Sequence, residues 1–148
     1  MNPYTDRHAQ LYKGFNKNCR NPDYSTNPFP NKKLCSGLND EFLLLKAGKS
    51  IDEIKALIFE FAEEAAYRNG YKYDEGLSKK NSAKYKFRKV YIAETRNKII
   101  SYLCVDVESG GFEVFDKNQI HLGQYDFSGE QSKEAEPKTH KGTSKNPH

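Results

Sequence analysis

Residues 112–130 read FEVFDKNQIHLGQYDFSGE and are the stretch that decides the fold. Two runs of apolar and aromatic residues, 112–115 and 120–125, suit the pleated surface of a strand, and the polar residues 116–119 between them tolerate turn conformations. A second turn follows at 126–129, where Gly129 can adopt a positive φ without steric cost. The stretch therefore predicts a β-hairpin that is closed at both ends.

This hairpin carries one carboxylate and one imidazole, on Glu113 and His121. Because side chains alternate along a strand, the length of the loop decides whether the two share a face. A three-residue loop pairs Phe115 with His121 and places His121 on the face of Glu113, whereas a two-residue loop pairs Val114 with His121 and places it on the other. The simpler interpretation is a solvated glutamate and a structural histidine.

Composition indicates a small protein with a modest core. Of 148 residues, 36% are hydrophobic and 30% charged, and the mean hydropathy is −0.92. Ten tyrosines and nine phenylalanines argue against disorder of the whole chain. There is no signal peptide and no apolar run long enough to span a bilayer, so we expect a soluble chain with no membrane partner and a cytoplasmic site of action.

The chain upstream of the hairpin predicts an α+β protein. We expect an irregular and helical segment over 1–78, with a short helix at 41–47 behind an Asn39-Asp40 cap and a main helix at 51–69 behind a Ser50–Glu53 capping box. Acidic residues 53, 60, 63 and 64 are expected to face away from its apolar side, and 71–78 to form a loop. A basic arm and antiparallel sheet follow over 79–130, with strands at 90–94 and 99–105 and turns at 96–97 and 106–111. Residues 131–148 are expected to form a flexible polar tail.

Basic residues are concentrated immediately before the hairpin. Residues 79–98 hold eight Lys or Arg side chains and one acid, so the rest of the chain is net negative although the whole carries +4. Within this block, residues 84–88 alternate cations with aromatic rings, which suits an RNA-binding surface as well as a strand with one buried face. The candidate RNA-binding residues here are Lys84, Tyr85, Lys86, Phe87, Arg88, Lys89, Arg96 and Lys98.

The cysteines predict neither a metal site nor a disulfide framework. The chain has three cysteines, Cys19, Cys35 and Cys104, and no two of them form a C-x-x-C motif. No two histidines have the spacing of metal ligands, so neither a metal nor another cofactor is expected. Cys104 lies in an apolar run and is expected to be buried. Cys19 and Cys35 would bridge only in an oxidising compartment.

Metal-independent RNA cleavage needs a base for the 2′-hydroxyl, an acid for the leaving 5′-oxygen and cations around the phosphate. Glu113 is the candidate base. Ser109 has too high a pKa to donate a proton at neutral pH, so His121 or His140 would be the acid. Asp126 is expected to cap its turn.

Residues 98–140 resemble the cytotoxic ribonuclease domain of the ribosome-inactivating, cloacin-type colicins. The resemblance rests on the HLGQYD run at 121–126, on the Gly and Gln that follow it, and on Glu136-Pro-Lys138. It implies a small, highly twisted antiparallel sheet and a toxin domain that cleaves ribosomal RNA without a metal. It also implies a cognate immunity protein, and secretion or delivery as part of a larger toxin. Residues 1–78 are not covered.

Carried over residue by residue, the resemblance assigns the catalytic Glu to Glu113 and the supporting Asp to Asp106. The family's catalytic His falls on Ser109, and its C-terminal Arg falls on Thr139, between Lys138 and His140. Two of the four functional positions therefore differ. Either His121 or His140 substitutes, or the target differs, or this chain binds RNA without cutting it.

Three hypotheses follow from the sequence. The first is a toxin-type endoribonuclease that acts on the ribosome and inhibits translation. The second is a non-catalytic RNA-binding module. The third is an antitoxin-like inhibitor that presents the acidic side of the 51–69 helix to a basic partner.

Overall fold

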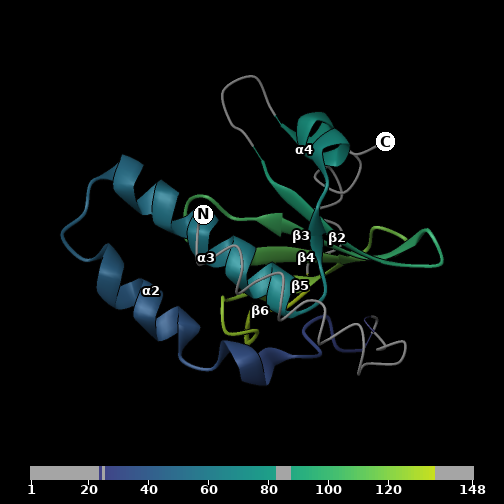
Figure 1. Ribbon diagram of the computed structural model, residues 1–148, viewed down its shortest axis with the longest axis horizontal. Coiled ribbons are helices and arrows are strands. Elements are labelled where there is room, and N and C mark those ends of the chain that lie inside the picture. The colour runs from purple at the N-terminus through teal and green to yellow at the C-terminus, as the bar shows by residue number, and fades with distance from the viewer. Residues whose placement is uncertain (1–23, 25, 83–87, 136–148) are drawn as a thin grey trace, which may run out of the picture.

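A computed structural model describes Tyr24, residues 26–82 and residues 88–135. The elements run in the order η1 (Lys32–Cys35), α2 (Leu38–Lys46), α3 (Ile51–Arg68), β1 (Lys72–Tyr73), α4 (Glu75–Asn81), β2 (Val90–Thr95), β3 (Lys98–Val105), β4 (Phe112–Asp116), β5 (His121–Tyr125) and β6 (Gln131–Lys133). Helices are followed by an antiparallel sheet, and the α+β prediction is confirmed (Figure 1).

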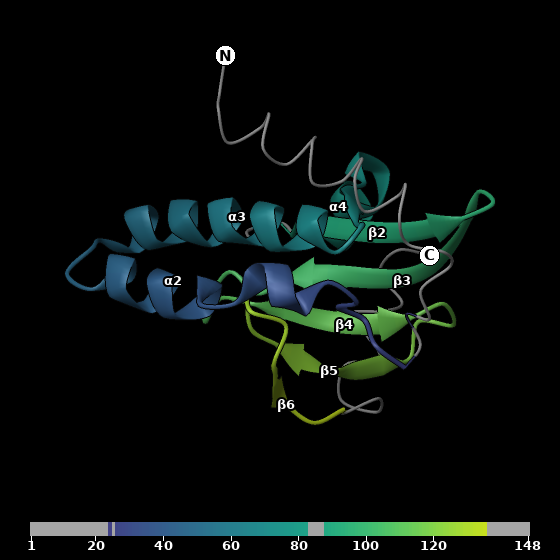
Figure 2. The same ribbon diagram turned by 60° about the horizontal axis from the view of Figure 1, so that its bottom comes forward.

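The sheet is an open antiparallel meander whose six strands lie in sequence order, β1 to β6. Figure 2 shows β2 to β6 in this order. Between β2 and β3, Arg96 and Asn97 have φ angles of 53° and 66°. Two left-handed residues form the turn type that matches the twist of a two-residue hairpin, so the predicted turn at 96–97 is confirmed. The predicted turns at 106–111 and 126–129 also form, and Gly129 has a φ of 84°.

Helix α3 begins at the predicted capping box. The Ser50 side chain accepts from the Glu53 backbone N–H at 3.2 Å, and Glu53 Oε1 accepts from the Ser50 N–H at 2.9 Å. The backbone hydrogen bond lowers the pKa of the Glu53 carboxyl. Helix α2 runs alongside α3, and the connection between them extends past the end of the sheet (Figure 1).

The main core lies between these helices and one face of the sheet. Phe42 of α2 meets Phe127 edge-on with ring centroids 5.0 Å apart, and Phe127 meets Phe112 of β4 at 5.7 Å. Phe29 lies 5.7 Å from Phe112, and Phe61 of α3 packs in the same cluster. Residues before and after position 78 therefore share one core.

Two features of the helical pair differ from the prediction. Helix α2 begins at Leu38 rather than at residue 41, because Asn39 is not its cap: the Asn39 N–H donates to Ser128 Oγ at 2.9 Å and its Oδ1 accepts from the Phe127 N–H at 3.3 Å. Glu64 does not face away from the core, since it is 6% exposed and paired with Arg68 one turn later.

The loop predicted at 71–78 is wrong. Lys72 and Tyr73 form β1, which pairs with β2, and Asp74 then caps α4 by accepting from the Leu77 N–H at 2.8 Å. The tail prediction is wrong for residues 131–133, which form β6 against β5. Residues 136–148 lie outside the described part of the chain, as do four of the five residues of the 84–88 arm, and the following strand begins at Val90.

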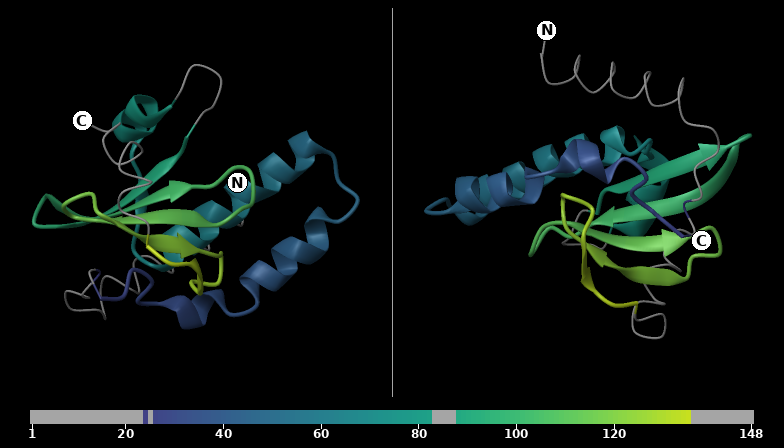
Figure 3. Two further views of the ribbon diagram at one scale, coloured as in Figure 1. Left: turned by 180° about the vertical axis from the view of Figure 1, so that it is seen from behind. Right: turned by 90° about the horizontal axis from the view of Figure 1, so that it is seen from below.

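The second face of the sheet carries a smaller apolar cluster. Val90, Ile92, Cys104 and Phe115 form it, and Leu77 of α4 packs against it. Cys104 is buried with a free thiol, as predicted; Cys35 is also a buried free thiol, and Cys19 lies outside the described residues. The two long helices thus cover one face, while the other is only partly covered, by α4 (Figure 3). None of the described helices is both long and apolar enough to cross a membrane.

Candidate functional site

The β4–β5 loop has the length that brings Glu113 and His121 together. The Asp116 N–H donates to the Ile120 carbonyl at 3.0 Å, and Asp116 Oδ1 accepts from the N–H groups of Asn118 and Ile120 at 2.8 and 2.9 Å. This three-residue loop pairs Phe115 with His121. His121 therefore lies on the face of Glu113, which is the first of the two registers that the sequence allowed.

The two side chains are in direct contact. His121 Nε2 lies 2.7 Å from Glu113 Oε1, and the His121 ring packs against Phe115 with centroids 5.3 Å apart. The His121 side chain is 2% exposed and that of Glu113 is 16% exposed. An ionised carboxylate only accepts hydrogen bonds. With Glu113 ionised, the His121 ring therefore donates this hydrogen bond through its Nε2–H group.

This contact limits what His121 can do. A general acid that works opposite Glu113 needs a separation of about 5–7 Å, so that a phosphodiester fits between two groups at hydrogen-bond distance. The contact at 2.7 Å leaves no such space. The structure instead makes His121 a group that fixes the position of the Glu113 carboxylate.

A second polar cluster lies beside this pair and is centred on Asp106. Its Oδ2 accepts from Ser109 Oγ and from Gln124 Nε2, each at 2.6 Å, and its Oδ1 accepts from the N–H groups of Glu108 and Ser109 at 2.9 and 3.2 Å. Gln124 pairs with Glu113 across the two strands. The hydrogen-bonded cluster of Asp106, Ser109 and Gln124 therefore lies next to the Glu113–His121 pair on one face of the sheet.

Gln124 reaches this face because β5 contains a bulge. Strict alternation from the Phe115–His121 pair would place Gln124 opposite Phe112, on the core face. The observed register pairs Val114 with Gly123 and leaves Leu122 as the extra residue, which moves Gln124 to the face of Glu113. Gln124 is not among the residues predicted from the sequence, although a glycine inside an apolar strand is a signal for a bulge.

One cation adjoins the cluster. The guanidinium of Arg88 lies near the thiol of Cys104, and Cys104 pairs with Glu113 across β3 and β4. Burial raises the pKa of the Cys104 thiol to about 11, and the Arg88 guanidinium opposes that shift. Arg88 Nε is buried and donates to no acceptor among the described residues.

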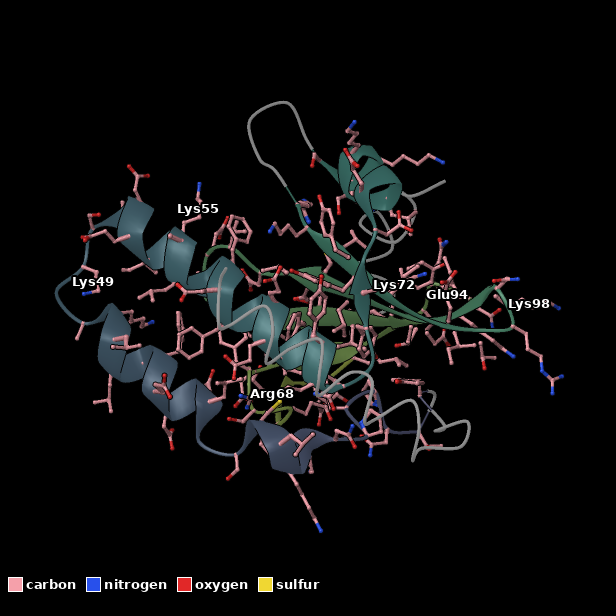
Figure 4. All side chains as sticks on the ribbon, viewed as in Figure 1. Lys49, Lys55, Arg68, Lys72, Glu94 and Lys98 are labelled. Carbon is pink, nitrogen blue, oxygen red and sulfur yellow. The ribbon has the colours of Figure 1, made fainter. Side chains whose placement is uncertain are left out.

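The other candidate RNA-binding residues that the structure describes, Lys89, Arg96 and Lys98, do not converge on Glu113. Lys89 lies on the helical face, where its Nζ is 4.9 Å from the centre of the Phe59 ring and 5.4 Å from that of Tyr73. Lys98 lies at the tip of the β2–β3 hairpin (Figure 4), about 20 Å along β3 from Cys104, and Arg96 is in the same turn. Five candidate RNA-binding residues lie outside the described residues: Lys84, Tyr85, Lys86 and Phe87 in the basic arm, and Lys138 near the C-terminus. The candidate acid His140 also lies outside them.

Within residues 24, 26–82 and 88–135, no three His, Cys, Asp or Glu side chains are grouped so as to hold a metal ion. Comparisons of the chain with protein families, with curated proteins and with solved structures found no match.

Proposed function

We propose that the protein is a toxin-type endoribonuclease that cleaves ribosomal RNA without a metal and so inhibits translation. The observation that supports this most directly is the Glu113 carboxylate, held by His121 at 2.7 Å beside the Asp106–Gln124 hydrogen bond, on the sheet face that the long helices leave open. Asp106 and Glu113 are the positions to which the colicin resemblance assigns catalytic roles.

In this reaction Glu113 takes the proton of a 2′-hydroxyl, and the resulting oxygen attacks the adjacent phosphorus. The bond from phosphorus to the 5′-oxygen breaks, which leaves a 2′,3′-cyclic phosphate and a 5′-hydroxyl. Arg88, next to Cys104, supplies positive charge for the phosphate as it gains negative charge. The leaving oxygen takes its proton from His140 or from water, because His121 directs its Nε2 proton at Glu113.

Cleavage is tested with intact ribosomes and with purified ribosomal RNA in a chelating buffer. Wild-type protein is expected to inhibit cell-free translation and to produce RNA ends with a 2′,3′-cyclic phosphate. Glu113→Gln keeps the shape of the side chain but removes the base, so we expect the cleavage rate to fall by roughly 100-fold or more. Glu134→Gln, at an exposed position, is the matched control. Equal activity of wild type and Glu113→Gln, or no product from either, would overturn the proposal.

A second candidate is a non-catalytic RNA-binding module. Two observations favour it: His121 is in contact with Glu113 rather than opposite it across a phosphate, and Ser109 occupies the family's histidine position with its hydroxyl donated to Asp106. This alternative predicts RNA binding that weakens steeply with salt and no cleaved product after long incubation.

We also propose a cognate immunity protein as the partner of the toxin, binding over the face that bears Glu113. The antitoxin-like hypothesis is less well supported, because Glu64 is paired with Arg68 inside the fold rather than presented to a partner.

A further inference from the structure

Two connections of the sheet lie at the same end of the molecule and carry exposed cations. Because the strands form an antiparallel meander in sequence order, the β2–β3 turn and the β4–β5 loop leave the sheet at one end (Figure 2). Arg96 lies in the β2–β3 turn, Lys98 begins β3 directly after it, and Lys117 lies in the β4–β5 loop. All three residues are exposed, and they are called the distal cations below.

The strand register brings the distal cations close to one another. Ser101 of β3 pairs with Asp116 of β4, so Lys98 lies three residues beyond this pair and Lys117 lies one residue beyond it. With strands about 4.8 Å apart and an advance of about 3.3 Å per residue, the two lysine backbones are separated by roughly 10 Å. Arg96 is two residues from Lys98 in the chain. Three long side chains at this spacing can contact neighbouring phosphates of one RNA strand.

The carboxylates at this end of the sheet are already engaged. Within residues 94–98 and 116–120 there are two, Glu94 and Asp116. Glu94 is paired with Lys72, and Asp116 Oδ1 accepts from two N–H groups of its own loop. The distal cations themselves form no ion pair with any residue that the structure describes. Their positive charge therefore faces solvent and suits a polyanion.

The fold gives no reason for an arginine at position 96. Arg96 has a φ of 53° and is the first of the two left-handed residues of the β2–β3 turn. Asparagine, aspartate and glycine are preferred at this position, because they adopt the left-handed conformation with less strain. A residue that the backbone disfavours and that no described contact requires is a sign of a functional role.

We propose that Arg96, Lys98 and Lys117 form a second phosphate-binding site, which holds a single RNA strand at a distance from the nucleotide on which Glu113 acts. Lys117 is four residues along the chain from Glu113, or about 13 Å. A stacked strand advances about 3.4 Å per nucleotide, so four nucleotides or more reach from one site to the other. Phosphate contacts carry no sequence information, so the second site adds affinity for RNA of any sequence. This inference rests on the proposed function only in taking RNA as the ligand, and it applies equally to binding without cleavage.

The test measures RNA binding in the Glu113→Gln background, so that cleavage does not interfere. Fluorescence anisotropy with oligo-A and oligo-U of about 12 nucleotides, at salt concentrations from about 0.05 to 0.3 M, gives the affinity and its salt dependence. In the triple variant Arg96→Asn, Lys98→Gln, Lys117→Gln we expect binding to be about 10-fold weaker or more at about 0.1 M salt. The slope of log affinity against log salt should become less steep by about 2, the value for three lost phosphate contacts on a single strand. The two oligonucleotides should lose affinity equally.

A matched control removes the same charge elsewhere. The control variant combines Lys33→Gln, Lys49→Gln and Lys55→Gln, three exposed lysines of the helical segment. Figure 4 shows Lys49 and Lys55 at the end of the molecule opposite Lys98. Because the change in net charge is identical, a general electrostatic effect would lower the affinity of both variants equally. We expect the control to keep the salt slope of the parent protein.

Arg96→Asn alone separates RNA binding from folding. Asparagine suits the left-handed position, so this variant should unfold at the same temperature as the parent or at a higher one, while its salt slope becomes less steep by about 0.7. A lower unfolding temperature would show that the arginine serves the fold. That result, equal losses in the triple and control variants, a loss for one oligonucleotide alone, or no RNA binding by the parent would each overturn the second site. Absence of cleavage by the wild type, with RNA binding intact, would instead count only against the nuclease.

Discussion

At the scale of single residues, Asn69 joins the segment before α2 to the end of α3. It is fully buried, and its Oδ1 accepts from the Asn31 N–H at 2.7 Å while its Nδ2 donates to the Ala65 carbonyl at 2.9 Å. Its carbonyl accepts from the Tyr24 hydroxyl at 2.7 Å. The sequence predicted Asn69 only as the last residue of the main helix, but its side chain also binds the backbone of Asn31, 38 residues away.

We predict that Asn69→Ala lowers the free energy of unfolding by about 2–4 kcal/mol, because the Asn31 N–H is left without its acceptor and a buried space is created. Chemical denaturation followed by circular dichroism measures the change. Asn118→Ala, at an exposed loop position, should cost less than about 0.5 kcal/mol. Similar losses in the two variants would contradict the role given to Asn69.

The sequence predicted the arrangement of Glu113 and His121 except for one unknown, the length of the β4–β5 loop. Alternation predicted that Glu113 and His121 would share a face if the loop had three residues, and it has three. Alternation could not predict the bulge at Leu122, because a bulge depends on the local backbone of Gly123 and on the packing of β6 next to it. Gln124 was therefore missed, although it bonds directly to Asp106.

At the scale of elements, length and amphipathic pattern decided which predictions held. Helix α3 has 18 residues, a capping box and a clear apolar side, so the sequence specified it almost fully. Strand β1 has two residues and α4 has seven, and neither is long enough to show a period. Strand β6 is polar and exposed throughout, because it is held to β5 by backbone hydrogen bonds rather than by burial of apolar side chains.

The β3–β4 connection requires glycine at position 111, because any side chain there would clash with the backbone. Gly111 has a φ of 86°, and a Cβ there would lie 2.3 Å from the Tyr125 carbonyl oxygen. Gly48, between α2 and α3, has a similar φ of 75°, but a Cβ there would have no neighbouring atom within 4 Å. The two glycines thus share the conformational requirement and differ in the space around them.

We predict that Gly48→Ala costs about 1 kcal/mol of folding free energy and that Gly111→Ala costs about 3 kcal/mol or more, since the second adds a backbone clash to the strain. Urea denaturation of both variants gives the comparison. Equal costs would mean that the β3–β4 turn relaxes freely around the added methyl group.

At the scale of the whole molecule, the described cations of residues 88–98 do not form one surface. Lys89 is held over aromatic rings on the helical face, Arg88 adjoins the proposed site, and Lys98 lies at a distant hairpin tip. Alternation along β2 and the turn at 96–97 separate these residues in space although they are close in sequence. Of the described cations in residues 88–98, Arg88 is therefore the one that lies near Cys104, opposite Glu113.

The same compact core makes the protein sensitive to alkali. Burial raises the pKa values of the Cys35 and Cys104 thiols from 9.0 to about 11, and it raises those of the Tyr71 and Tyr91 hydroxyls above their usual value of 10.0. Above pH 9 the unfolded chain loses these protons while the native chain keeps them. The unfolded state is then favoured, by up to about 1.4 kcal/mol per pH unit for each group.

We therefore predict that these four groups leave the free energy of unfolding nearly independent of pH below pH 8. Between pH 9 and 11 their titration should lower it steeply. Unfolding midpoints measured by circular dichroism across this range, with tyrosinate absorbance at 295 nm, test the prediction. Tyr71→Phe removes one of the titrating groups together with its hydrogen bonds to Ser101 and Pro28, at 2.7 and 2.8 Å. This variant should be less stable at pH 7 but lose less stability on going to pH 11. A wild-type midpoint that stays constant to pH 11 would show that these four groups are not shielded from water as the core packing requires.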